Sequence, residues 1–240
     1  MQFPGHLLGA RPSIDGELWV SYLEKALAIH CGGWDEIDGG PTTHALALMT
    51  GCKRQFIFMR NEETHKYQCF GKYNEKTKEC TKQYNSPQTA SEMNFRVPWP
   101  RVGGGGHPNQ EFDDNKMFQR MCSWNDYNYV LCAGSKEFQD EAAASGIVQN
   151  HAYTVIGCHA DVADTGIDLI KMRNPWGAGQ VENADFEEDG PGWKLFPEIK
   201  AELKPMFVGD GIFYLTKEEF FELFDHIYLS CSDMTVFKED

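Results

Sequence analysis

The strongest constraint on the fold is a series of strand-like segments between residues 127 and 231, with few helical stretches between them. The segments are YNYVLCAG, HAYTVIGCH, IDLIKMR, GIFYL and HIYLSC, all rich in β-branched and aromatic residues. The second and third are joined by the turn-rich ADVADTG, which predicts a β-hairpin. Successive strands with few helices between them favour antiparallel pairing. The sequence therefore predicts an α+β fold, with a mainly antiparallel, barrel-like sheet and peripheral helices.

Helical patterns flank these strands. GELWVSYLEKALAIH repeats apolar residues at three- and four-residue spacing, with Asp15 as the predicted N-cap and Gly32 just past its end. A shorter helix is predicted in PTTHALALMT, and another through Met117 and Met121 with Asp113 or Asp114 as its cap. A further helix is predicted in KEEFFELFD, where Thr216 and Glu219 have the spacing of a capping box.

The charge and composition of the chain limit the kinds of partner that it can bind and indicate its cellular compartment. The chain has 22 basic and 36 acidic residues and a formal net charge of −14, which argues against nucleic acid or an anionic membrane as a partner. No apolar run approaches the roughly 18 residues of a membrane-spanning helix. The first residues lack a basic, apolar signal pattern, and the eight cysteines include no CxxC pair. We therefore expect an intracellular, cytoplasmic protein with reduced thiols.

The predicted hairpin places two polar side chains opposite each other. If its turn is centred between Val162 and Ala163, residues whose numbers sum to 325 face one another, so His151 lies opposite Asn174. A carboxamide oxygen can fix the imidazole tautomer and leave the other ring nitrogen free to accept a proton. Trp176 would share that face and shield the pair if the strand continued. The alternative is two polar residues at hairpin ends, satisfied by backbone or solvent.

Several segments resemble the second catalytic subdomain of calpains, in the same order along the chain. They are ELWVSYLEKALAIHCGGWDEIDGGPTTHALALMTG, GIVQNHAYTVIGC, IDLIKMRNPWG and GDGIFYLTKEEFFELFDHIYLSC. The resemblance implies half of a papain-like cysteine protease core. In that core His151 would be the general base and acid, Asn174 its orienting partner and Trp176 a supporting cover.

The resemblance also implies a division of the chain. Residues 1–12 would be a lead, 13–231 the subdomain with an insertion at about 60–112, and 232–240 a tail.

One departure from the calpain pattern concerns the nucleophile. In calpains the catalytic cysteine lies in the preceding subdomain and is followed by tryptophan, whereas no cysteine of this chain precedes a tryptophan. Cys158 is seven residues from His151 on one predicted strand, so we expect the two to point to opposite faces. The chain alone is therefore predicted to be inactive, with the cysteine supplied by an upstream or separate subdomain and a protein or peptide as substrate.

A second departure concerns calcium. The resemblance implies a calcium loop after the NPWG segment, with Gln180, Glu187 and Asp210 at ligand positions and Ile212 at a position that is acidic in the family. Calcium favours six to eight oxygens, several from carboxylates. Gln180 carries no charge and Ile212 has no side-chain oxygen, so we predict weak or no calcium binding here.

Two functions from different classes follow. One is the His/Asn-bearing half of a calpain-type cysteine endopeptidase. The other is a non-catalytic calpain-like binding or scaffolding protein, a pseudoenzyme that keeps the fold without the chemistry. A third interpretation, an unrelated antiparallel β protein with a chance motif, predicts that His151 and Asn174 lie far apart.

Overall fold

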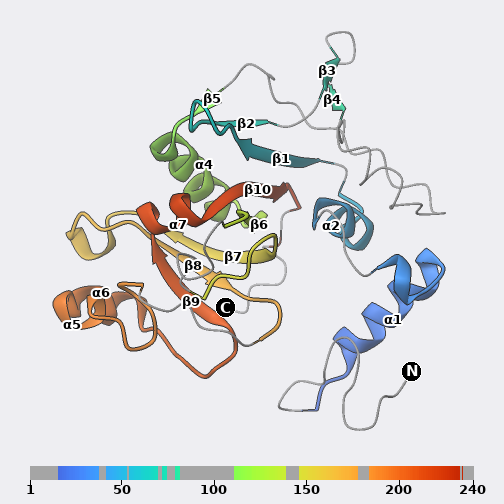
Figure 1. The fold of residues 1–240 in the computed structure, drawn as a ribbon. Helices are drawn as coiled ribbons and strands as arrows, with labels where there is room; N and C mark the ends of the chain where they lie inside the picture. Colours follow the sequence, from blue (N-terminus) through green and yellow to red (C-terminus); the bar gives the residue numbers. More distant parts are fainter. Residues whose placement is uncertain are drawn as a thin grey trace.

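The computed structural model describes residues 16–37, 42–52, 54–69, 72–74, 79–81, 111–138, 146–177, 184–232 and 234. The fold is α+β, with an eight-stranded antiparallel sheet in the order β5-β2-β1-β10-β6-β7-β8-β9 (Figure 1). Its strands are β1 (Gln55–Arg60), β2 (Tyr67–Cys69), β5 (Glu111–Phe112), β6 (Val130–Ser135), β7 (Ala152–His159), β8 (Leu169–Arg173), β9 (Ile212–Thr216) and β10 (Phe224–Ser230). A separate two-stranded ladder pairs β3 (Lys72–Asn74) with β4 (Glu79–Thr81).

Helices surround the sheet. They are α1 (Trp19–Cys31), η1 (Trp34–Glu36), α2 (Thr42–Thr50), α4 (Asp114–Asp126), η3 (Val162–Asp164), α5 (Gly192–Leu195), α6 (Pro197–Leu203) and α7 (Lys217–Leu223). In the described part of the chain, no helix is long and apolar enough to cross a bilayer.

Two clusters of buried side chains lie on the two faces of the sheet. The larger one joins α4 and α7 to alternate residues of the central strands, including Met117, Tyr153 and Phe220. The smaller one packs Trp193 of α5 and Ile199 of α6 against β8 and β9. The two groups of helices therefore cover opposite faces of the sheet at β8 and β9 (Figure 1).

Most helix boundaries follow the predicted signals. Gly32 ends α1 in the left-handed conformation, and the Asp113 side chain caps α4 by accepting from the Lys116 amide. Thr216 and Glu219 form the predicted capping box of α7. The prediction of Asp15 as the N-cap of α1 is wrong, because the helix begins at Trp19 and the residue before it sits at the cap.

The predicted hairpin is present, but its predicted register is wrong. Thr154 pairs with Arg173, so paired residue numbers sum to 327 rather than 325, and to 328 beyond a register shift between Val155 and Gly157. A β-bulge at Ile156 accounts for the change within the hairpin. The alternation of faces along β7 consequently changes at residue 156.

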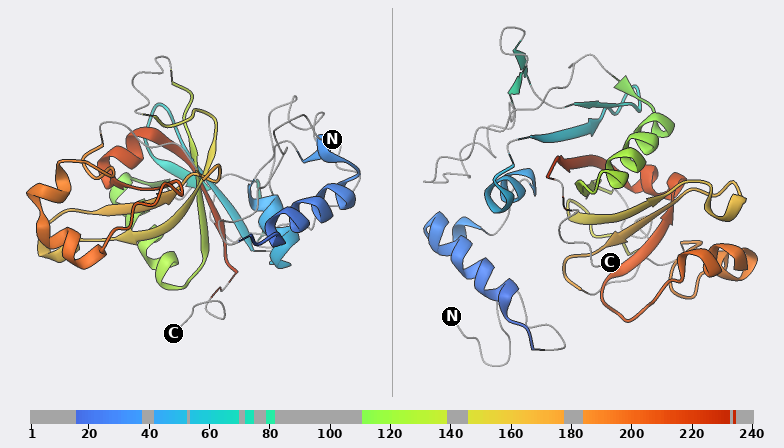
Figure 2. Two further views of the ribbon diagram at one scale, coloured as in Figure 1. Left: turned by 90° about the horizontal axis from the view of Figure 1, so that it is seen from below. Right: turned by 180° about the vertical axis from the view of Figure 1, so that it is seen from behind.

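The ends of the predicted insertion take part in the main sheet. β2 pairs with β1, and β5 pairs with β2, which places residues 67–69 and 111–112 at one sheet edge. At the other side of the molecule, α2 packs on β1 and β10, while α1 lies beyond α2 and away from the sheet (Figures 1 and 2).

Candidate active site

The structure brings His151 and Asn174 together. His151 Nε2 lies 3.3 Å from Asn174 Oδ1, although the two residues are not directly paired in the strand ladder. His151 immediately precedes β7 and Asn174 immediately follows β8. The interpretation in which the motif is a coincidence predicted a large separation and is therefore wrong.

The hydrogen bonds of Asn174 determine which imidazole nitrogen carries the proton. Asn174 Oδ1 accepts the backbone N–H of Trp176 at 3.1 Å, and this identifies it as the oxygen of the carboxamide. An oxygen acceptor requires a donor on the ring, so His151 Nε2 carries hydrogen. In the neutral imidazole, Nδ1 is then unprotonated and can accept a proton.

The backbone around Asn174 is fixed by hydrogen bonds. Its amide donates to the Gly211 carbonyl at 2.9 Å, and its carbonyl accepts from the Gly177 amide at 3.0 Å. Asn174 is 3% exposed, so its carboxamide is shielded from competing water. Gly211 has φ +83°, and a Cβ at this position would lie 2.8 Å from the Asn174 carbonyl oxygen. Only glycine fits this close approach without a shift.

Ser135 fixes the backbone of His151. The His151 amide donates to Ser135 Oγ at 3.0 Å, and the Ser135 amide donates to the His151 carbonyl at 3.0 Å. Ser135 Oγ in turn donates to the Val148 carbonyl at 2.6 Å. Because Ser135 is 4% exposed and ends β6, it joins the loop before His151 to the sheet.

Two aromatic rings contact the imidazole. The Tyr153 ring meets it edge-on at 5.0 Å between centroids, and the Trp176 ring lies 4.5 Å away at 41°. The Tyr153 hydroxyl accepts the Val148 amide at 2.9 Å, and burial raises the pKa of Tyr153, which keeps the hydroxyl neutral. Trp176 is 64% exposed, so it shields one side of the pair while keeping a face open to solvent.

Sequence reasoning missed Ser135 and Gly211 and gave Tyr153 no role. Tyr153 follows His151 by two residues, and strand periodicity alone would have placed both rings on one face. Ser135 and Gly211 are remote in sequence from the residues they hold. Their contribution depends on tertiary contacts that no local pattern reveals.

The expectation that Cys158 and His151 point to opposite faces assumed unbroken alternation along the strand, and the register shift at Ile156 interrupts that alternation. The bulge at Ile156 returns Cys158 to the face of Tyr153 and Val155, and all three belong to the larger core cluster. Cys158 is nevertheless buried, and seven residues of strand span roughly 20 Å. It is therefore too far along β7 to attack a carbonyl activated beside His151.

Two of the three calcium candidates, Glu187 and Asp210, lie in the described part of the chain. Gln180 lies outside the described residues. Asp210 Oδ1 accepts the Ile212 amide at 3.2 Å, and the Asp210 carbonyl accepts from Arg173 Nε at 3.2 Å. Among the described residues, no group of three or more His, Cys, Asp and Glu side chains is arranged to hold a metal ion. Weak or absent calcium binding remains a prediction, and calorimetric titration with calcium would test it.

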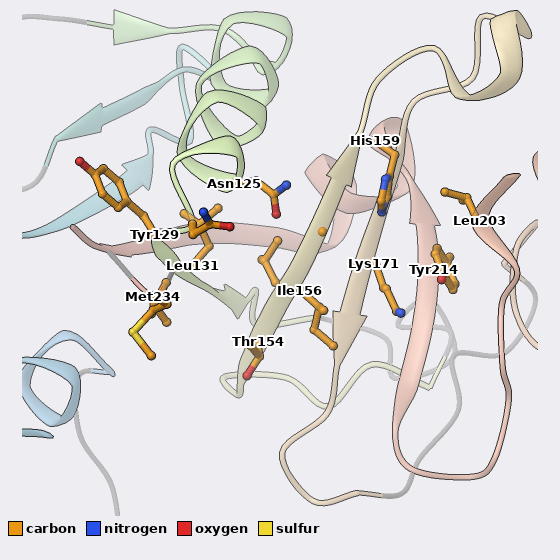
Figure 3. A pocket seen from close by; sticks show the side chains of 14 residues that line it. Asn125, Tyr129, Leu131, Thr154, Ile156, His159, Lys171, Leu203, Tyr214 and Met234 are labelled. Atoms are coloured by element: carbon orange, nitrogen blue, oxygen red, sulfur yellow. The ribbon is translucent and has the colours of Figure 1, made fainter. Parts of the chain in front are cut away.

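The structure also has a pocket of about 560 Å³ (Figure 3). Its lining comes mainly from the end of α4 and from β6 to β9, and includes Asn125, Ile156, His159, Lys171 and Tyr214. Neither His151 nor Asn174 lines it. The His–Asn pair is thus not part of the lining of this pocket.

The chain is similar in sequence to known proteins over most of its length. A family model described as calpain family cysteine protease matches residues 4–231. Calpain clp-1 of Caenorhabditis elegans is 24% identical over 223 residues, which cover 92% of this chain and 22% of that protein.

Two further relatives extend the comparison. The calpain-type cysteine protease DEK1 of Zea mays is 27% identical over 94% of this chain and 8% of its own length. Calpain-7 of Sus scrofa is 26% identical over 94% of this chain and 22% of its own length. The chain thus spans about a fifth or less of these relatives.

Proposed function

Because the chain belongs to the calpain family of cysteine proteases, we propose that it is the His/Asn-bearing half of a cysteine endopeptidase active site. The observation that carries this proposal is the 3.3 Å contact between His151 Nε2 and Asn174 Oδ1, which leaves Nδ1 as the proton acceptor. His151 is the general base and acid, Asn174 fixes its tautomer, and Trp176 shields their hydrogen bond. The substrate is a peptide bond in a protein or peptide.

The reaction needs a thiol beside Nδ1. His151 takes the thiol proton, and the sulfur attacks the peptide carbonyl to form a tetrahedral intermediate. The C–N bond then breaks as His151 returns the proton to the leaving amine, which leaves a thioester. Water, deprotonated by His151, hydrolyses the thioester and regenerates the thiol. Asn174 keeps the imidazole in the required orientation throughout.

The thiol comes from outside residues 1–240 in this proposal. Cys158 is buried on β7, and the described contacts of the His151 ring are with Tyr153, Asn174 and Trp176. Further support comes from α1, where Trp19, Tyr22 and Ile29 are 62%, 66% and 72% exposed. An apolar helix surface of this kind is typical of one that another polypeptide segment covers.

The proposal is tested on the natural, full-length protein. Wild type, His151→Ala, Asn174→Ala and the control His65→Asn, at an exposed turn histidine, are purified and assayed on an unfolded protein substrate. We expect His151→Ala to lower kcat/KM by at least about 100-fold. Asn174→Ala should lower it less, and His65→Asn should leave it unchanged. An electrophilic peptide probe that alkylates thiolates, followed by peptide mapping, identifies the nucleophile.

Two results would contradict the proposal. Probe labelling of a cysteine within residues 1–240 would place the nucleophile in this chain. A folded full-length protein with no hydrolysis and no His151-dependent labelling would favour the non-catalytic binding or scaffolding function instead.

A further inference from the structure

The pocket over β7, β8 and β9 has a basic lining in an acidic chain (Figure 3). Its volume of about 560 Å³ is in the range typical of sites for small organic ligands. Lys171 and His159 line it, whereas no aspartate or glutamate is among the described residues that do so. Because the chain as a whole carries a net charge of −14, this local excess of basic groups favours an anionic ligand.

Strand pairing places the two basic side chains on one face of the sheet. Lys171 is the ladder partner of Gly157 on β7 and of Tyr214 on β9. Gly157 has no side chain, and the His159 ring lies over its position, since a Cβ there would be 2.7 Å from His159 Nε2. On the other side, Lys171 Nζ lies over the Tyr214 ring, 5.7 Å from its centroid. The pocket therefore presents an ammonium group and an imidazole together.

The charge of Lys171 is not neutralised by the described part of the protein. Lys66, Lys116 and Lys217 each form an ion pair with a carboxylate, but no described carboxylate forms one with Lys171. Burial, and after it the charge of Lys171, lower the pKa of His159, so its ring is neutral at neutral pH. A carboxylate that entered the pocket would thus meet an ammonium group without displacing a described acidic partner.

The rest of the pocket is largely apolar. Ile156, at the β-bulge of β7, lines it and is 40% exposed. Figure 3 shows Lys171 and His159 on one side of Ile156, and Tyr129 and Met234 on the other. An inorganic anion would leave this apolar surface in contact with water. A ligand that joins a carboxylate to an apolar group would cover it and gain the free energy of burial.

We propose that this pocket binds an organic carboxylate with an apolar body. Lys171 binds the carboxylate, and the surface around Ile156 receives the apolar group. The end of a peptide with an aliphatic last residue and a free aliphatic acid share this chemistry. Neither His151 nor Asn174 lines the pocket, so the proposal does not depend on the proposed peptidase activity.

The test is calorimetric titration of the natural, full-length protein with two matched ligands. N-acetyl-leucine and N-acetyl-leucinamide have the same apolar group and differ in the carboxylate. We expect the acid to bind about 10-fold more tightly than the amide, because only the acid forms a charge-assisted hydrogen bond with Lys171. Isocaproate has the carboxylate and the aliphatic group without a peptide bond. Isocaproate binding as tight as that of N-acetyl-leucine identifies a free acid as the ligand, and weaker binding identifies a peptide end.

Substitutions locate the bound ligand. Lys171→Met keeps a straight side chain without the charge and should bind the acid no more tightly than the amide. Lys200→Met, the control, removes an exposed lysine of α6 that does not line the pocket, and should bind both ligands like wild type. Ile156→Glu places a carboxylate in the pocket and should weaken binding of the acid. His151→Ala should bind like wild type, because the proposed peptidase site takes no part. Thermal melting shows whether each variant is folded.

A second readout is the NMR spectrum of methyl-labelled methionines. The acid should shift the methyl signal of Met234, which lines the pocket, and leave that of Met49 on α2 unchanged. Three results would overturn the proposal. They are equal affinity of wild type for acid and amide, undiminished acid binding by folded Lys171→Met, and loss of acid binding in folded His151→Ala. The first of these comparisons needs no variant, so it decides the proposal even if Lys171→Met does not fold.

Discussion

Two oxygen atoms at the His–Asn pair each take part in two hydrogen bonds. Asn174 Oδ1 accepts hydrogen bonds from the Trp176 amide and from the His151 ring. One oxygen therefore holds both the imidazole and the turn that carries Trp176, whose ring shields the imidazole. Ser135 Oγ likewise accepts the His151 amide while donating to the Val148 carbonyl. Substitutions that remove such an atom should therefore break two hydrogen bonds at once.

Ser135→Ala should destabilise the fold around His151. The substitution leaves the Val148 carbonyl and the His151 amide without their buried partner, and we expect the free energy of unfolding to fall by about 2 kcal/mol. Urea unfolding of both chains measures the difference. Ser123→Ala is the control, because this exposed hydroxyl donates only to its own helix, and it should change stability by less than about 0.5 kcal/mol. Equal effects of the two substitutions would contradict the role given to Ser135.

Gly211→Ala should displace Asn174. A methyl group there meets the Asn174 carbonyl oxygen at 2.8 Å and also occupies a left-handed backbone position. Gly209→Ala is a matched control, since Gly209 has φ +67° with nothing within 4 Å of an added Cβ. We expect unfolding free energy to fall by about 1 kcal/mol for Gly209→Ala and by clearly more for Gly211→Ala. NMR spectra should show shifted Asn174 side-chain amide signals for Gly211→Ala alone.

At the scale of elements, local sequence signals predict helix ends and turns correctly, but they do not predict the register in which strands pair. The hairpin, the α4 cap and the α7 capping box are confirmed because each depends on neighbouring residues. The register differs because the turn is centred on Asp164 rather than between Val162 and Ala163, and the bulge at Ile156 then changes it by one residue. α5 and α6 were missed because DGPGW looks like a turn. Their burial depends on contacts of Trp193 and Ile199 with β8 and β9.

His151 and Asn174 meet even though the predicted register is wrong. Both lie just outside the paired strands, where hydrogen bonds to Ser135 and Gly211 direct the chain. The motif therefore identified the right pair, while the geometry that joins them comes from residues remote in sequence.

Thr216→Ala should weaken the start of α7. Thr216 Oγ1 accepts the Glu219 amide at 3.2 Å, and Glu219 Oε2 accepts the Thr216 amide at 2.7 Å. Loss of the cap should lower the unfolding free energy by about 1 kcal/mol, measured by urea unfolding. Thr216→Ser retains the hydroxyl and should remain within about 0.5 kcal/mol of wild type. A loss of the same size in both variants would show that the methyl group, not the cap, matters.

At the scale of the whole molecule, α1 stands apart from the sheet and exposes apolar side chains (Figure 2). Such a surface favours self-association when its natural cover is absent. We expect the 240-residue chain to sediment as larger species with rising concentration and the pair Trp19→Ser, Ile29→Ser to remain monomeric. The control pair Leu195→Ser, Met206→Ser removes equally exposed apolar groups from the opposite end. If the variant with Trp19→Ser and Ile29→Ser sedimented like the unsubstituted chain, self-association would not involve the surface of α1.

The central position of β10 has a consequence for synthesis. In the described sheet, β10 joins β1 on one side to β6 on the other, although it is made about 170 residues after β1. At ribosomal rates of roughly 5–20 residues per second, β1 waits on the order of ten to thirty seconds for its partner. During that interval the edge of β1 is open to strands of other nascent chains, and the edge of β6 joins it once residues 130–135 have been made. The topology thus exposes unpaired strand edges during translation that the finished sheet pairs.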